Sequence, residues 1–309
     1  MSKMRKPILY GLLLFVMVVW GFNVIAVKII VENFAPVTIT SFRILLAGTV
    51  VLLILIFQKE MKKINKVEAM YVAIGAFTGV LGHHIFLALG LTTTTASNAS
   101  LILGLIPLMT SIFAVWFLKS TFTIGKLLGV ILGFAGVLFI VLSGASSVYS
   151  VSIGDFFVFM SVIAQAISFV AIKKASQTLD TKVMTGYMLI LGSLFLFITS
   201  LLMEPSGLNS LPEGPFYVWI IFIVSAVVAT GLGHIIYNNA IHHLGAGETA
   251  IFINLTPFFA LTGSVLFLGE KITYFQLMGF VFIISGVLLG SGLFDNKISQ
   301  RREPVVKSY

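Results

Sequence analysis

Long apolar runs, separated by short polar stretches, recur along the whole chain. A helix needs about 20 residues to cross about 30 Å of hydrocarbon, and lipid offers no partner to an unpaired backbone group, so such runs must be helical. The pattern predicts an all-α integral membrane protein with ten transmembrane helices. The predicted spans are Ile8–Val31, Thr38–Phe57, Val67–Gly90, Ala96–Leu118, Ile124–Leu142, Ile153–Ile172, Met184–Met203, Phe216–Ala240, Ala246–Leu268 and Tyr274–Leu293.

Composition favours a membrane environment over an aqueous one. Of the 309 residues, 58% are hydrophobic and 10% are charged, whereas soluble domains carry about 25% charged residues. The first apolar run is too long for a signal peptide and lacks an A-x-A-like cleavage site, so we expect it to remain as the first helix. Because the chain has no cysteine, disulfides and thiolate metal sites are excluded.

The net charge of +8 indicates membrane topology and not a nucleic-acid partner. Lysines and arginines gather before the first span, in alternate connections and in the basic tail 295–309. The remaining connections carry the acidic residues Glu32, Asp155, Glu204, Glu213 and Glu270. Since basic residues concentrate on the cytoplasmic side, ten crossings place both termini in the cytoplasm. We expect a multi-pass protein of the cytoplasmic membrane.

Two parts of the chain repeat one another. The segment that begins "PLMTSIFAVWFLKS" at Pro107 matches "PFFALTGSVLFLGE" at Pro257. Upstream, "LGHHIF" at Leu81 matches "LGHIIY" at Leu232, and the first span matches the sixth weakly. These correspondences predict two five-helix repeats, residues 1–145 and 146–294, that precede the tail.

An odd number of helices in each repeat inverts the second copy relative to the membrane. Inverted repeats can exchange conformations, and alternating-access transporters use them to open a midplane site to either side of the membrane. The pattern therefore favours a transporter over a duplicated bundle without a transport role.

Several motifs occur in a characteristic order: "WGFNVIAVK" from Trp20, "SFRILLAG" from Ser41, the helices of Pro107 and Pro257, and "LGE" from Leu268. Through them the chain resembles the EamA family of the drug/metabolite transporter superfamily over nearly its whole length. The two repeats differ at one motif position, where the first has Lys119 and Ser120 and the second has Gly269 and Glu270. We therefore interpret Glu270 as a helix-end feature. The resemblance implies ten helices, internal termini and the movement of small metabolites, often amino acids and often outward.

Polar residues within the spans should face the bundle interior or a cavity, because a polar group facing lipid is costly. In the eighth span His234, Tyr237 and Asn238 follow helical spacing and share one face. We interpret them as the lining of a substrate cavity, with interhelical hydrogen bonding as the alternative.

Other candidates for the cavity come from matched positions of the repeats. Trp20 and Asn23 lie one turn apart in the first span, and their counterparts Gln165 and Ser168 lie one turn apart in the sixth. Symmetry-related polar pairs are typical of a binding site at a repeat interface.

Two adjacent histidines lie in the third span. His83 is the counterpart of His234, whereas His84 points about 100° away on an ideal helix. We therefore expect only His83 of this pair to face the cavity.

The starts of the fourth and ninth spans also correspond, with Asn98 opposite Glu248. Glu248 is either an anion that stabilises a helix N-terminus or a titratable group at the cytoplasmic mouth of the cavity. Pro107 and Pro257 break the helical hydrogen bonding inside these spans, so each is a candidate hinge or kink.

Two basic residues and a set of glycines complete the picture. We expect Lys28 and Arg43 to act near the outer face, Lys28 by extending its amine to the membrane surface. The glycines of the fifth and tenth spans have the small-xxx-small spacing of close helix contacts. They predict a scaffold or a homodimer surface.

Other classes of protein fit the residues less well. A membrane-embedded enzyme would need a catalytic constellation, and the chain has no H-E-x-x-H, paired aspartates or cysteine, so we expect no enzymatic activity and no cofactor. A metal site at the histidines would ordinarily add carboxylates or thiolates, and none is predicted. For coupling, His234 and Glu248 support proton dependence, with uncoupled facilitated exchange as the alternative.

Overall fold

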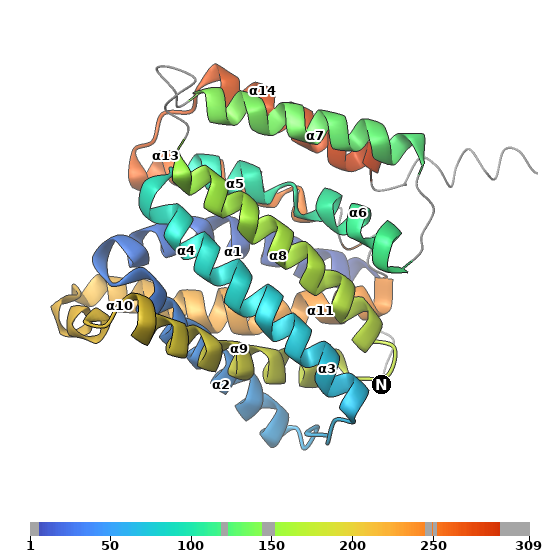
Figure 1. Cartoon of the computed structure of the whole chain (residues 1–309), viewed down its shortest axis with the longest axis vertical. Helices are drawn as coiled ribbons and strands as arrows, with labels where there is room; N and C mark the ends of the chain where they lie inside the picture. The colour runs from blue at the N-terminus through green and yellow to red at the C-terminus, as the bar shows by residue number, and fades with distance from the viewer. Residues whose placement is uncertain (1–5, 119–122, 144–151, 245–248, 250–251, 291–309) are drawn as a thin grey trace, which may run out of the picture.

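The structure, a computed structural model, describes residues 6–118, 123–143, 152–244, 249 and 252–290 (Figure 1). Within these ranges it contains helices and turns and no strand, so the predicted all-α class is confirmed. The α-helices are α1 (Lys6–Asn33), α2 (Pro36–Phe57), α3 (Lys66–Gly75), α4 (His83–Thr93), α5 (Ala96–Leu103), α6 (Ile106–Leu118), α7 (Ile124–Ser143), α8 (Ile153–Ala175), α9 (Thr181–Met203), α10 (Phe216–Val224), α11 (Gly233–Leu244), α13 (Thr256–Leu268) and α14 (Tyr274–Gly290).

Seven helical segments of the described chain are long and apolar enough to cross a membrane. They cover Pro7–Asn33, Pro36–Phe57, Lys66–Thr93, Ala96–Phe117, Ile153–Ala175, Thr181–Met203 and Phe216–Ala240. The other three predicted spans correspond to the shorter apolar helices Leu127–Ile140, Thr256–Leu268 and Tyr274–Leu289. The chain is therefore a multi-pass membrane protein, and its ten crossings stay a prediction.

Four of the predicted spans are irregular, and they occupy matching places in the two halves. The third and eighth contain π-helical segments, η1 (Ala76–Gly82) and η4 (Ser225–Leu232). The fourth is divided by a turn at residues 104–105, and the ninth has a turn at residues 254–255 before α13. π segments inside α-helices are frequent at functional sites, so these irregularities mark the region in which a site is expected.

Helices of one half pack mainly on helices of the other. In Figure 1, α7 lies beside α14 along one edge of the bundle, and α2 packs against α9. The contact of α1 with α13 has a counterpart in the contact of α8 with α6, and the contact of α4 with α8 has one in that of α11 with α1. Exchanging the first five spans for the last five therefore leaves the packing scheme unchanged.

The glycines of α7 and α14 serve contacts within the chain. A methyl group added at Gly136 would lie 2.7 Å from the carbonyl oxygen of Gly279, and one at Gly286 would lie 2.7 Å from that of Gly129. The two backbones can approach this closely because these positions carry no side chain.

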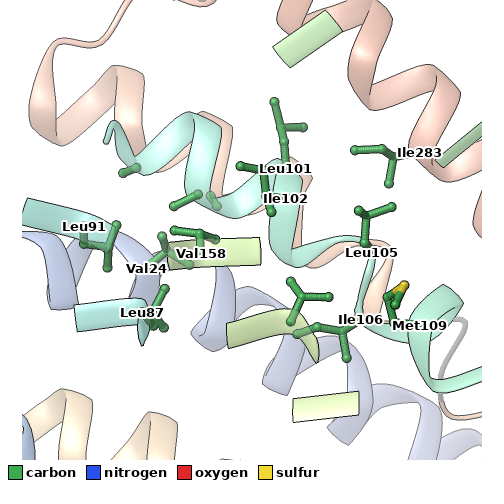
Figure 2. Packing of buried hydrophobic residues seen from close by; sticks show 14 of the residues in the cluster. Val24, Leu87, Leu91, Leu101, Ile102, Leu105, Ile106, Met109, Val158 and Ile283 are labelled. Atoms are coloured by element: carbon green, nitrogen blue, oxygen red, sulfur yellow. The ribbon is translucent and has the colours of Figure 1, made fainter. Parts of the chain in front are cut away.

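The most extensive core cluster lies where α1, α4, α5, α6, α8 and α14 converge. Figure 2 shows Leu101 and Ile102 on α5, Leu105 at the turn that follows, and Ile283 on α14 facing this turn. All four side chains are buried. The turn that divides the fourth span is thus held in a packed interior.

Two glutamates join the halves at one end of the bundle, which we call the acidic end. Glu204, just after α9, accepts hydrogen bonds from the backbone N–H groups of Val37 and Thr38 at 3.0 and 2.8 Å. Glu270, just after α13, accepts from the N–H groups of Ala96 and Ser97 at 2.8 and 3.0 Å. Each carboxylate therefore supplies acceptors to the first turn of a helix from the other half, where the N–H groups lack partners of their own.

The opposite end, the basic end, brings together two lysine-rich connections. Lys182 at the start of α9 forms an ion pair of 2.7 Å with Glu60, which follows α2. Tyr187 donates a hydrogen bond to the carbonyl oxygen of Lys62 at 3.1 Å. The basic residues around positions 59–66 and 173–182 therefore gather on one side of the bundle.

Candidate functional site

A cavity of about 120 Å³, lined by both apolar and polar side chains, lies between the two halves. Its walls come from α1, α2, α4, α5, α8, η4, α11 and the start of α13. Aliphatic side chains and Phe169 form much of the lining. The polar or aromatic side chains that complete it are Trp20, Asn23, Arg43, His83, His84, Ser100, Gln165, Thr230, His234 and Thr256.

Trp20 connects α1 to the irregular eighth span. Its Nε1 donates a hydrogen bond to the carbonyl oxygen of Ala229 in η4 at 2.9 Å. Its ring lies 5.2 Å from that of His234 and 5.0 Å from that of Tyr237, centroid to centroid. Tyr237 is only 2% exposed and also stacks on Phe169. Trp20 and His234 thus border the cavity, whereas Tyr237 supports Trp20 from behind and is not part of the lining.

Asn23 belongs to a hydrogen-bond network that reaches Arg43. Ser225 in η4 donates to Oδ1 of Asn23 at 2.6 Å and lies 3.4 Å from Nη1 of Arg43. The same nitrogen donates to Oγ1 of Thr230 at 3.0 Å. Nη2 of Arg43 lies 3.3 Å from Nδ1 of His84. Because a guanidinium only donates, this nitrogen of His84 acts as the acceptor.

The expectation that Arg43 acts near the outer face is wrong. Arg43 is 1% exposed and lines the cavity, about two turns inside α2. The side chain extends from α2 toward η4 and α4, where it contacts the hydroxyl groups of Ser225 and Thr230 and the imidazole of His84. A charged residue within a span ordinarily faces the bundle interior, and that rule would have identified Arg43. Lys28 does lie near the acidic end, where it pairs with Glu32 at 2.9 Å.

One histidine in each half places Nδ1 near a backbone carbonyl oxygen, which for His83 lies on another helix and for His234 lies four residues earlier in its own span. Nδ1 of His83 lies 3.2 Å from the carbonyl oxygen of Ser161, and Nδ1 of His234 lies 2.8 Å from that of Thr230. A carbonyl only accepts, so both Nδ1 atoms carry the proton and leave Nε2 as an acceptor.

The expectation that His84 faces away from the cavity is wrong. His83 and His84 both line it, with ring centroids 4.9 Å apart. A separation of about 100° on the helix does not remove either ring from a cavity that several helices surround.

A smaller cavity of about 20 Å³ adjoins the first toward the basic end. The two share His84, Gln165 and His234. Ser168 and Asn238 line the smaller one, and Nδ2 of Asn238 donates to Oγ1 of Thr185 at 2.6 Å. The structure therefore brings Asn238 and Ser168 together beside the main cavity and not inside it.

The helix breaks of the fourth and ninth spans border the main cavity. Ser100 and Gly104 line it on one side, and Thr256 and Pro257 on the other. Pro257 lies within the first two residues of α13, directly after a turn. Pro107 has the matching place as the second residue of α6 but is not among the lining residues. Both prolines thus follow a break and do not kink a continuous helix.

The remaining sequence candidates lie elsewhere. Asn98 is buried in the first turn of α5, accepts a hydrogen bond from Nε2 of Gln276 at 2.8 Å, and does not line the cavity. Its short polar side chain serves contact with α14 instead. Glu248 lies outside the described residues. Within the described part of the chain, no three histidine, aspartate or glutamate side chains are grouped closely enough to hold a metal ion.

Two related helical halves that enclose a cavity in a membrane-spanning bundle are typical of transporters assembled from repeats. The chain belongs to the EamA-like transporter family, which matches residues 7–142 and again residues 152–292. The family resemblance predicted from the sequence is therefore confirmed.

Similarity to known proteins covers most of the chain. An uncharacterized transporter of Bacillus subtilis (strain 168), YyaM, is 32% identical over 272 residues, which cover 86% of this chain and 88% of that protein. An uncharacterized transporter of Archaeoglobus fulgidus is 27% identical, with 90% and 95% covered. A solved crystal structure with 14% sequence identity matches 95% of this chain and 98% of its own at a TM-score of 0.66, which shows a shared fold.

Proposed function

We propose that this protein is a secondary transporter that moves small metabolites, amino acids or related compounds, out across the cytoplasmic membrane by alternating access. The observation that carries the proposal is the cavity between the halves, lined by Trp20, Asn23 and His83 of the first and by Gln165 and His234 of the second. Substrate sites of repeat-built transporters lie at such interfaces, next to discontinuous helices. Here the breaks before α6 and α13 supply the discontinuity.

The two repeats take opposite orientations in this proposal. The exchange-symmetric packing and the matching π segments support two related units, and five spans in each would invert the second. The basic end faces the cytoplasm, as its lysines favour. Substrate therefore enters the cavity from the basic end and leaves at the acidic end.

Proton coupling is the form of energy use that the residues support most directly. His234 lines the cavity, and Glu248 follows the eighth span in the sequence. Uncoupled exchange is the alternative, because it needs no titratable group. Vesicle transport with and without an imposed pH gradient, at zero membrane potential, separates the two for the wild type and Glu248→Gln.

A matched pair of histidine variants tests the cavity. His234 and His243 both lie on α11, and each places Nδ1 near the carbonyl oxygen four residues earlier, at 2.8 and 2.9 Å. His234 lines the cavity, whereas His243 is exposed. We expect His234→Ala to lower uptake into proteoliposomes about tenfold, the factor that about 1.4 kcal/mol of lost interaction gives, and His243→Ala to leave it unchanged.

The substrate for this assay comes from a toxicity screen of amino acids, amines and carboxylates in cells that overproduce the protein. Equal transport by both histidine variants at equal expression would contradict the assignment of the cavity. Release of a chemically altered compound in place of the substrate itself would contradict transport.

A further inference from the structure

Arg43 contributes a positive charge to the cavity wall, and within the described residues no carboxylate forms an ion pair with it. The side chain is 1% exposed. Its contacts are the two hydroxyl groups and the imidazole described above, all of them neutral. The ion pairs formed within the described part of the chain lie elsewhere, at Lys28 with Glu32 and at Lys182 with Glu60.

The hydrogen bonds of Arg43 leave donor capacity unused. A guanidinium has five N–H groups, and its Nε atom is buried without a partner. Of the contacts to Nη1, the one to Ser225 is long at 3.4 Å. Burying a charge is costly unless it is paired, so the arrangement is incomplete until an anion occupies the cavity.

We infer that the cavity takes small organic molecules that carry one carboxylate, and that Arg43 binds this group. The inference rests on the proposed transport function and names the chemical class of its substrate. A guanidinium binds a carboxylate through two parallel N–H···O hydrogen bonds. Among the described residues, the lining contains no lysine, second arginine, aspartate or glutamate, so a single negative charge neutralises it. A phosphate dianion would leave a buried negative charge.

The rest of the lining defines the body of the substrate. Trp20, Val24, Leu87 and Phe169 offer apolar and aromatic surface, which suits an aliphatic or aromatic group attached to the carboxylate. An amine without a carboxylate would place a second positive charge near Arg43. An amino acid remains acceptable, because its ammonium group can donate to neutral acceptors such as the Nε2 atoms of His83 and His234.

A matched ligand series tests the assignment with the purified protein in nanodiscs. The probes are 3-phenylpropanoate, its amide, 3-phenylpropylamine and 2-phenylethyl phosphate, and an isobutyl series of the same four head groups. We expect the wild type to bind the carboxylate at least about tenfold more tightly than the amide, amine or phosphate of the same body, as hydrogen bonds to a charged group imply.

Substitution of Arg43 should remove this preference without removing the cavity. Arg43→Gln should bind carboxylate and amide within about threefold of each other while keeping the wild-type affinity for the amide. Arg43→Lys should keep a reduced preference, because it retains the charge and loses the bidentate geometry. Lys28→Gln, the control at the acidic end, should behave as the wild type. If Arg43→Gln does not fold, Arg43→Lys and the wild-type series still decide the question.

Several results would overturn the inference. They are a wild type that prefers the amine, the amide or the phosphate, an Arg43→Gln protein that keeps the carboxylate preference, or no binding of either carboxylate. Transport of amides or amines with exclusion of carboxylates would overturn it and leave the proposed transport function intact. Tight, Arg43-dependent carboxylate binding with no movement of any compound into proteoliposomes would support it and overturn transport.

Discussion

The indole of Trp20 holds an irregular part of the neighbouring half in place. Its N–H pairs with the carbonyl oxygen of Ala229, inside the π segment η4. A side chain from the other half of the chain thus donates to a carbonyl oxygen of this π segment. The contact therefore joins the first span to the element that also presents Ser225 and Thr230 to Arg43.

Replacing Trp20 by phenylalanine tests this contact. Trp20→Phe keeps an aromatic ring and removes the N–H donor, so we expect the free energy of unfolding to fall by about 1 kcal/mol. The measurement is the thermal unfolding midpoint in detergent, with Trp116→Phe as the control because Trp116 is 70% exposed. Equal midpoints for the two variants would contradict a structural role for the hydrogen bond.

Single residues could be assigned from the sequence where two independent rules met. Trp20, Gln165, His83 and His234 are polar or amphipathic residues within spans and also occupy matched positions of the repeats, and all four line the cavity. Arg43 satisfied only the first rule, and its position near the start of a span suggested the membrane surface. Which face of α2 meets η4 depends on tertiary packing that helical periodicity does not contain.

At the level of the elements, the first turns of α2 and α5 both donate backbone hydrogen bonds to a carboxylate that comes from another part of the chain. Ala35 before α2 has no side chain able to cap the helix. Thr95 before α5 accepts from the N–H of Asn98 only. Glu204 and Glu270 provide the missing acceptors from other helices. Glu270 is a helix-end residue, as its position after α13 suggested, but it serves the start of a different helix.

Neutralising these glutamates should weaken the bundle at the acidic end. Glu204→Gln and Glu270→Gln each replace charge-assisted hydrogen bonds by neutral ones, which are roughly half as strong. We expect each variant to lose about 1 kcal/mol of stability and the double variant about the sum, because the two sites share no partner. Thermal unfolding measures this, with the exposed Glu213→Gln as control. A double variant as stable as the control would refute it.

Helix positions were predictable to within a few residues, whereas the breaks inside them were not. The span predicted as Val67–Gly90 falls within Lys66–Thr93, because apolar length alone determines it. The turn at residues 104–105 lies in a packed interior, with Leu105 near Ile283 (Figure 2), and apolar length does not encode such packing. Pro107 and Pro257 indicated roughly where the helices are interrupted, but not that each interruption is a turn located before the proline.

At the scale of the whole molecule, the two ends of the bundle differ in charge. Lysine-rich connections meet at one end, and Glu204 and Glu270 join helices at the other. This polarity follows from the alternation of basic and acidic connections along the sequence. Which helices of the two halves pack together could not be predicted from the sequence. The repeats show which helices correspond to one another but not which ones are in contact.

Reporter fusions test the orientation of these ends. By the positive-inside rule, a reporter after Tyr309 or within residues 176–180 should behave as cytoplasmic, and one within residues 205–214 as exported. Fusions to alkaline phosphatase and to green fluorescent protein at each site give opposite signals. Phosphatase activity at Tyr309, or fluorescence at residues 205–214, would contradict ten crossings with internal termini.

The lone charge of Arg43 also bears on how membrane voltage acts on the protein. The described lining carries one positive charge when the cavity is empty and no net charge when a carboxylate is bound. Voltage should therefore act on the return of the empty carrier, by at most about 2.3 kcal/mol per 100 mV, and not on the loaded step. Exchange of labelled for unlabelled carboxylate across proteoliposomes should be indifferent to an imposed potential, while net flux should depend on it.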